Sequence, residues 1–83
     1  MTEAFASPEA RLLDHVAKQL VDDPDKVVVT ESRDGDFLKL HLAVAETDVG
    51  KVIGRGGRIA KAIRALLKVM ATRDGSKVSL DID

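Results

Sequence analysis

Three glycines and two arginines occupy residues 54 to 58, and these residue types can hold a phosphate group. Glycine has no Cβ atom, so the backbone of a ligand can come close to the main chain at Gly54, Gly56 and Gly57. The guanidinium groups of Arg55 and Arg58 donate hydrogen bonds in a geometry that suits phosphate oxygens. A helix beginning after these glycines would add its unpaired N-terminal amides, which attract anions. Taken alone, the short Gly-x-x-Gly pattern is more often a plain turn that ends one helix and reverses the chain.

The charge of the chain is small overall but unevenly distributed. The net charge of −1 and the isoelectric point of about 6.1 argue against a partner held by overall charge. Residues 51–73 nevertheless contain seven basic residues and no acidic one, whereas the rest of the chain contains six basic and fourteen acidic residues. A helix that only solvates its own surface would benefit from acidic residues four positions away from basic ones. Their absence favours an anionic ligand, and the basic residues concerned are Lys51, Arg55, Arg58, Lys61, Arg64, Lys68 and Arg73.

The first half of the chain predicts a helix followed by a β-hairpin. Ser7-Pro8-Glu9 is typical of a helix start, with a capping hydroxyl, a proline and an acidic residue. Strands are expected over residues 26–32, which are rich in β-branched residues, and 37–44, which alternate between apolar and polar. Asp34-Gly35 supplies the turn between them. The apolar stripe of the helix is Leu12, Leu13, Val16, Leu20 and Val21.

The second half predicts two helices separated by the glycines. Thr47-Asp48 can cap a short helix, in which Gly50 and Gly54, four residues apart, would let another backbone approach closely. A longer helix is expected from about Arg58 until Asp74-Gly75, with a basic outer face. Its predicted buried residues are Ile59, Ile63, Leu66, Leu67 and Met70.

A last alternating strand over residues 78–82 completes the order α-β-β-α-α-β. This order predicts an α+β fold in which a three-stranded sheet packs against three helices. We expect a single domain over residues 8–83, preceded by a flexible tail at residues 1–7.

Several classes of function lack the residues they need. Cysteine is absent, which excludes disulfides, thiolate zinc sites and a cysteine nucleophile. Gly57 is followed by Arg58-Ile59 and not by Lys-Ser/Thr, so there is no Walker A motif, and the glycine spacing does not fit a dinucleotide site. His15 and His41 lie on different predicted elements. With no signal-peptide or membrane-span pattern, we expect a cytoplasmic protein that is not an enzyme and uses no cofactor, metal or small-molecule substrate.

The segment VGKVIGRGGRIAKAIR, residues 49–64, closely resembles the signature of KH domains. The resemblance is strongest to the small stand-alone bacterial KH proteins of the KhpA type, and it extends from the helix at Leu12 to the strand at Ile82. It implies the type II KH fold, whose element order matches the predicted one. It also implies that the loop Gly54-Arg55-Gly56-Gly57 clamps the backbone of about four nucleotides of single-stranded RNA, with the bases in an aliphatic groove beside it.

The resemblance assigns roles to individual residues. Gly54 and Gly57 frame the loop, and aliphatic residues beside it would line the floor of the groove, with the second strand as its far wall. The same aliphatic residues are equally compatible with plain core packing. The full set that we assign to RNA binding is Gly54, Arg55, Gly56, Gly57, Arg58, Lys51, Val52, Ile53, Ile59 and Lys61.

The resemblance further implies a homodimer and a larger KH-containing partner of the KhpB or Jag type. The corresponding role would be a global post-transcriptional regulator or RNA chaperone with an effect on cell shape. Two alternatives stay open. The domain could be a protein–protein interaction module with secondary or lost RNA binding, although such a module would not need Arg55 and the adjacent glycines. The ligand could also be single-stranded DNA, because the sequence does not reveal whether a 2′-hydroxyl is read.

Overall fold

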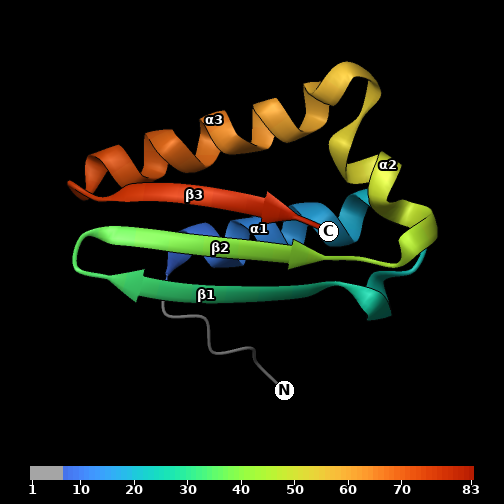
Figure 1. Ribbon diagram of the computed structural model, residues 1–83, viewed down its shortest axis with the longest axis horizontal. Coiled ribbons are helices and arrows are strands. Elements are labelled where there is room, and N and C mark those ends of the chain that lie inside the picture. Colours follow the sequence, from blue (N-terminus) through green and yellow to red (C-terminus); the bar gives the residue numbers. More distant parts are fainter. Residues whose placement is uncertain (1–6) are drawn as a thin grey trace.

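Three strands form one mixed sheet in the order β1-β2-β3, in a computed structural model that describes residues 7–83 (Figure 1). Strands β1 (Val28–Asp34) and β2 (Phe37–Ala43) form the predicted antiparallel hairpin, with Gly35 at a φ of 64° in its turn. Strand β3 (Lys77–Ile82) pairs in parallel with β2. Because β2 is its only strand partner within the described residues, β3 is an edge strand.

Three helices accompany this sheet. Figure 1 shows α1 (Pro8–Leu20) running behind the sheet, α2 (Val49–Ile53) at one end of it, and α3 (Arg58–Arg73) alongside β3. The order α-β-β-α-α-β and the α+β arrangement of three strands with three helices are thereby confirmed. Short 3₁₀ turns join the elements at Pro24–Lys26, Glu46–Asp48 and Arg55–Gly57.

The folded chain begins at Ser7. Its hydroxyl accepts a hydrogen bond from the amide of Ala10 at 3.1 Å and donates one to the carboxylate of Glu31 at 2.9 Å, so the residue caps α1 and also joins it to β1. Pro8 takes the first helical position, where its missing N–H is not needed. Of the flexible tail predicted for residues 1–7, residues 1–6 lie outside the described range. Ser7 itself is buried and belongs to the domain.

The core lies between the sheet and the helices, and β2 shows the predicted alternation. Leu38, Leu40 and Leu42 are almost fully buried on one face of the strand. They pack in one cluster with apolar residues from every helix and from β3: Ala10, Leu13, Ala17, Val52, Ile63, Leu67 and Leu80.

Two predictions about packing are wrong. Leu66 is 54% exposed, because the face of α3 that meets the core consists of Ala60, Ile63, Leu67 and Ala71. The small side chains of the two alanines fit where the helix approaches the core closely, while the sequence pattern favours large apolar residues. Gly50 permits no close approach either, since no described atom outside its own stretch of helix lies within 4 Å of the place a Cβ would occupy, whereas at Gly54 the chain does approach closely.

Candidate nucleic-acid interface

The reversal between α2 and α3 depends on three glycines with positive φ. Gly54 ends α2 with a φ of 78°, and its amide donates to the carbonyl of Gly50 at 2.9 Å. Gly56 and Gly57 follow with φ values of 63° and 78°. Residues with a Cβ rarely adopt this region of backbone conformation. The glycine content of the loop is therefore explained first by its geometry.

The three glycines differ in what surrounds them. A Cβ added at Gly54 would lie 2.7 Å from Cγ1 of Ile59 and 2.9 Å from its amide nitrogen, so Gly54 is needed for packing. At Gly56 and Gly57 no described atom lies within 4 Å of the added Cβ. The crest of the loop is open, and its main chain is accessible to a ligand.

Two of the amides that the sequence predicted to be unpaired are used within the loop. The amide of Gly57 donates to the carbonyl of Gly54 at 3.1 Å, and the amide of Arg58 donates to that of Arg55. No side chain of the described residues caps α3, and its first turn contains no acidic residue. The positive end of the helix dipole is therefore not neutralised locally.

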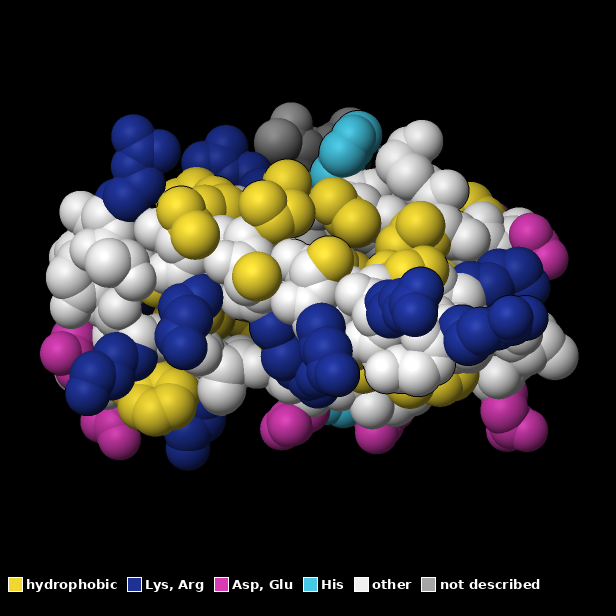
Figure 2. Space-filling view, turned by 90° about the horizontal axis from the view of Figure 1, so that it is seen from above, with side chains coloured by type: hydrophobic (Ala, Val, Ile, Leu, Met, Phe, Trp, Pro, Cys, Tyr) yellow, Lys and Arg dark blue, Asp and Glu magenta, His cyan; other side chains and the backbone are white. Residues whose placement is uncertain are grey.

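Lys and Arg side chains form a row along α3, next to a band of hydrophobic side chains (Figure 2). Arg55, Arg58, Lys61 and Lys68 are exposed, and no acidic side chain within residues 7–83 forms an ion pair with any of them. Acidic side chains lie towards the rim of this view. The predicted separation of charge is thus present on one surface of the molecule.

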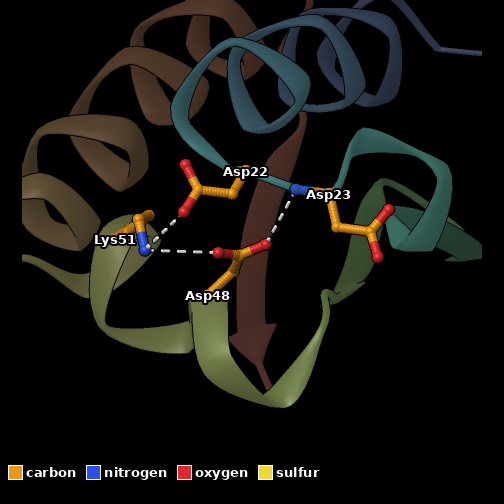
Figure 3. Close-up of polar contacts among 4 residues, drawn as sticks. All are labelled: Asp22, Asp23, Asp48 and Lys51. Atoms are coloured by element: carbon orange, nitrogen blue, oxygen red, sulfur yellow. Dashed lines mark hydrogen bonds and ion pairs between the residues drawn. The ribbon is translucent and has the colours of Figure 1, made fainter.

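Unlike these four cations, Lys51 forms ion pairs with two carboxylates. Its Nζ lies 3.3 Å from Oδ2 of Asp22 and 3.3 Å from Oδ1 of Asp48, as Figure 3 shows. Asp48 is 1% exposed, and its other oxygen accepts a hydrogen bond from the amide of Asp23 at 3.1 Å. Lys51, assigned to RNA binding from the sequence, therefore joins α2 to the turn after α1. Asp48 forms no side-chain cap on α2, contrary to the predicted Thr47-Asp48 cap.

The surroundings of Asp48 and Lys51 favour the charged form of each side chain. Burial alone would raise the pKa of Asp48, but hydrogen bonds from the amides of Asp23 and Asp22 and from Lys51 outweigh it, so the pKa is lowered. The pKa of Lys51 is raised by its hydrogen bonds to Asp22 and Asp48 and by their negative charge. At neutral pH the cluster is an ionic connection between α2 and the end of α1.

A groove of about 470 Å³ lies between α3 and β3. From the sequence we expected the second strand to form the far wall of the groove. In the structure β3 forms the far wall of this groove, because β3 lies between α3 and β2. The groove is lined by Lys61, Arg64, Ala65, Leu67, Lys68, Val78, Ser79 and Leu80. It begins about one helical turn after the glycine loop, since Lys61 lies roughly 5 Å further along the axis of α3 than Arg58.

The three aliphatic residues expected at the groove floor lie elsewhere. Val52 is fully buried, and Ile53 and Ile59 are partly buried and pack against the core. Of the predicted site residues, the structure brings Arg55, Gly56, Gly57, Arg58 and Lys61 together on the open surface.

Arg64 is a groove residue that the sequence-based assignment missed. Its Nε and Nη2 donate to the carbonyl oxygen of Leu80 at 3.3 and 3.2 Å. The regular spacing of Lys61, Arg64 and Lys68 could have indicated a shared flank of α3. No spacing in the sequence, however, indicates that β3 faces this flank of α3.

The two histidines lie on different elements, α1 and β2. His41 pairs with Asp83 at 2.9 Å, and His15 is exposed on α1. Within residues 7–83 no group of three or more His, Cys, Asp or Glu residues could hold a metal ion. None of the helices described is both long and apolar enough to span a bilayer.

Comparison with known proteins gives a consistent result. A family model described as "KhpA/KhpB, KH domain" matches residues 10–82. The "RNA-binding protein KhpA" of Halalkalibacterium halodurans is 48% identical over 71 residues, covering 86% of this chain and 93% of that protein. The protein of the same name from Treponema pallidum is 45% identical over 74 residues, covering 89% and 92%.

Two solved structures of Era show the same fold in a larger chain. An Aquifex aeolicus Era variant bound to GDP.AlF4- is 21% identical with a TM-score of 0.62, over 89% of this chain and 29% of that chain. Era in complex with MgGDPNP and nucleotides 1506–1542 of 16S ribosomal RNA is 19% identical with a TM-score of 0.56, over 99% and 35%. At these identities the likeness concerns the fold alone.

Proposed function

Because this chain belongs to the KhpA/KhpB family of KH domains, we propose that it binds single-stranded RNA along α3. The phosphates would contact the glycine loop, and the bases would enter the groove between α3 and β3. The observation that carries the proposal is the row of unpaired cations, Arg55, Arg58, Lys61 and Lys68, beside an open glycine crest in a chain of net charge −1. The names of the KhpA relatives support the same ligand.

The phosphate contacts would come mainly from arginine side chains. Arg55 and Arg58 flank the crest, where a ligand backbone meets no Cβ at Gly56 or Gly57. The positive end of α3 adds a favourable field for an anion. From Arg58 to Lys68 the helix rises by roughly 15 Å, a span suited to a few nucleotides.

The base contacts would rely on hydrogen bonds and apolar packing. No aromatic residue among residues 7–83 lines the groove, so base stacking on a ring of this part of the chain is not available there. Leu67 and Leu80 offer apolar surface, and Lys61 and Lys68 stand at the sides. With about three or four phosphate contacts, we expect an affinity on the order of micromolar for one domain and a strong dependence on salt.

A pair of double variants tests the loop. Arg55→Asp with Gly56→Asp places two acidic groups at the crest, where nothing within 4 Å obstructs the new side chain. Arg33→Asp with Gly35→Asp is the matched control, because Gly35 has a similar φ of 64°, equally open surroundings and an exposed arginine two residues before it. RNA binding is measured by fluorescence anisotropy, and folding by thermal melting.

We expect the loop variant to lose RNA binding and the hairpin variant to keep it, with both variants folded at the temperature of the binding assay. A folded loop variant that binds RNA as tightly as the wild type would remove the loop from the mechanism. The same oligonucleotide made as DNA is measured in parallel, and equal affinity for both would mean that the 2′-hydroxyl is not read.

A second candidate function, that of an interaction module, is favoured by one feature of α3. Leu66 and Val69, three residues apart on α3, are 54% and 60% exposed, so two neighbouring large apolar side chains of this helix are open to a partner. We therefore include homodimerisation in the proposal. Light scattering is expected to give a dimer mass for the wild type and a monomer mass for Leu66→Ser with Val69→Ser. A monomeric wild type at the concentrations that bind RNA would refute self-association.

In the cell, we propose that the protein acts in the cytoplasm as a post-transcriptional regulator or RNA chaperone, together with a larger KhpB/Jag-type partner. The support for this part is the family membership. This proposal is tested by crosslinking in cells followed by sequencing of the bound RNA, carried out with the wild type and, as a control, with the loop variant. Equal RNA recovery with wild type and loop variant would contradict it.

A further inference from the structure

The outer edge of β3 presents main-chain groups to the groove. The amide of Lys77 donates to the carbonyl of Asp36 at 2.8 Å, and the amide of Asp83 donates to that of Leu42 at 2.9 Å. These residues therefore direct their main-chain groups towards β2. Since the direction alternates along a strand, Leu80 directs its N–H and C=O away from β2, towards α3.

The side chain of Arg64 is hydrogen-bonded to the carbonyl oxygen of Leu80 on this edge. Two of its five N–H groups donate to the carbonyl of Leu80, at 3.3 Å from Nε and 3.2 Å from Nη2. The guanidinium has no acceptor of its own, and Arg64 is exposed and lines the groove, so its remaining N–H groups can donate to a ligand there. At this point the groove offers hydrogen-bond donors, whereas a bare strand edge would offer a donor beside an acceptor.

Resting on the proposed RNA binding, we infer that Arg64 determines which bases the groove accepts. A base with two neighbouring acceptors, such as cytosine at O2 and N3 or guanine at O6 and N7, can accept from the N–H groups of Leu80 and Arg64. Adenine presents an amino donor next to its N1 acceptor. Its amino group would have to displace a charged donor from the carbonyl of Leu80, and such charge-assisted hydrogen bonds are stronger than neutral ones.

The neighbouring lysines cannot play the same part. Lys61 and Lys68 also line the groove, but neither donates to the strand edge within the described residues. Their ammonium groups act as point charges and would attract every RNA similarly. Of the three cations that line the groove, Arg64 is the one whose hydrogen bonds change the donor and acceptor pattern of the strand edge.

The experiment compares Arg64→Met with Lys68→Met. Both substitutions remove one positive charge from the same flank of α3 and keep an unbranched apolar stem, but only the first frees the carbonyl of Leu80. Affinities for short cytidine and adenosine oligonucleotides of equal length are measured at one salt concentration by fluorescence anisotropy. Thermal melting checks that each variant is folded.

We expect the wild type to bind the cytidine oligonucleotide about fivefold more tightly than the adenosine one, a ratio at the lower end of what a pair of base-specific hydrogen bonds provides. Arg64→Met should bring the ratio to about one or below, whereas Lys68→Met should weaken both and keep the ratio. Equal weakening of both ligands by Arg64→Met, or a preference of the wild type for adenosine, would overturn the inference and leave RNA binding intact. Failure of the wild type to bind either oligonucleotide would instead overturn the proposed function.

Discussion

The hairpin turn and the loop after α2 have almost the same local geometry but opposite electrostatic surroundings. Gly35 and Gly56 have φ values of 64° and 63°, and neither has an atom within 4 Å of an added Cβ. Gly35 lies between Asp34 and Asp36, whereas Gly56 lies between Arg55 and Gly57, with Arg58 next. An open glycine turn is thus not a binding site by itself, and the charge around it makes the difference.

Within the loop a second contrast separates folding from binding. Gly54 packs against Ile59, while Gly56 and Gly57 face open space. One glycine therefore maintains the corner between α2 and α3, and the other two keep its crest bare. Variants of the individual glycines should separate these two roles.

The largest effect on stability is expected for Gly54→Ala. The new Cβ would lie 2.7 Å from Cγ1 of Ile59 at a φ of 78°, so backbone strain adds to steric overlap. We expect a loss of about 2–4 kcal/mol in the free energy of unfolding, measured by chemical denaturation. A loss no greater than that of Gly56→Ala would show that the contact with Ile59 is unimportant.

Salt should affect RNA binding next most strongly. With three or four phosphate contacts, a fourfold increase in monovalent salt is expected to lower the affinity by roughly 15- to 60-fold. The Lys68→Met variant, which removes one cation from the row along α3 but is expected to bind RNA still, should show a shallower dependence, and the hairpin variant should match the wild type. An affinity that stays constant with salt would contradict phosphate contacts altogether.

Smaller and similar losses of stability are expected for Gly35→Ala and Gly56→Ala. Each places a Cβ at positive φ in open space, which costs about 1 kcal/mol. Only Gly56→Ala should also weaken RNA binding, because only that turn is flanked by arginines. If both variants bind RNA equally well, the crest of the loop does not contact the ligand.

The smallest effect is expected from pH in the neutral range. The pKa of Asp48 lies below its ordinary 3.8, so the stability that it contributes is present above that pH and lost as pH falls through the folded value. The pKa of Lys51 lies above its ordinary 10.5, so its contribution is lost only as pH rises beyond that value. Thermal melting should therefore show no change from this cluster between about pH 5 and pH 9.

Asp48→Asn is the corresponding variant. It should lower the melting temperature by several degrees at neutral pH and reduce the loss of stability in acid. A melting temperature that is unchanged at neutral pH would mean that the cluster of Asp22, Asp48 and Lys51 does not stabilise the fold.

The fold could be predicted because its signals are local. The Ser7 cap, the Asp34-Gly35 turn and the glycines after Ile53 each mark an element boundary within a few residues. Strand β2 shows its buried face directly through its alternating leucines. Consequently the order of elements followed from the sequence, together with the resemblance to KH domains.

The errors concern contacts between distant residues. Lys51 looked like a free cation because Asp22, one of its two partners, lies before the hairpin in sequence, while Asp48, only three residues away, was interpreted as a helix cap. The far wall of the groove depends on the parallel pairing of β3 with β2, which no local pattern reveals. Leu66 was misplaced because the face of a helix that meets the core depends on how the helix packs against the sheet, and for Val52 the structure shows core packing, one of the two interpretations left open.

The covered edge of β3 also bears on how the protein behaves at high concentration. An open strand edge is a template on which a strand from another molecule can add, and this is a common route to aggregation. Here α3 lies alongside that edge, and Arg64 occupies the carbonyl of Leu80. The same side chain that we place in base selection therefore also helps α3 to shield the β3 edge from intermolecular strand addition, and the Arg64→Met variant would lose that contribution.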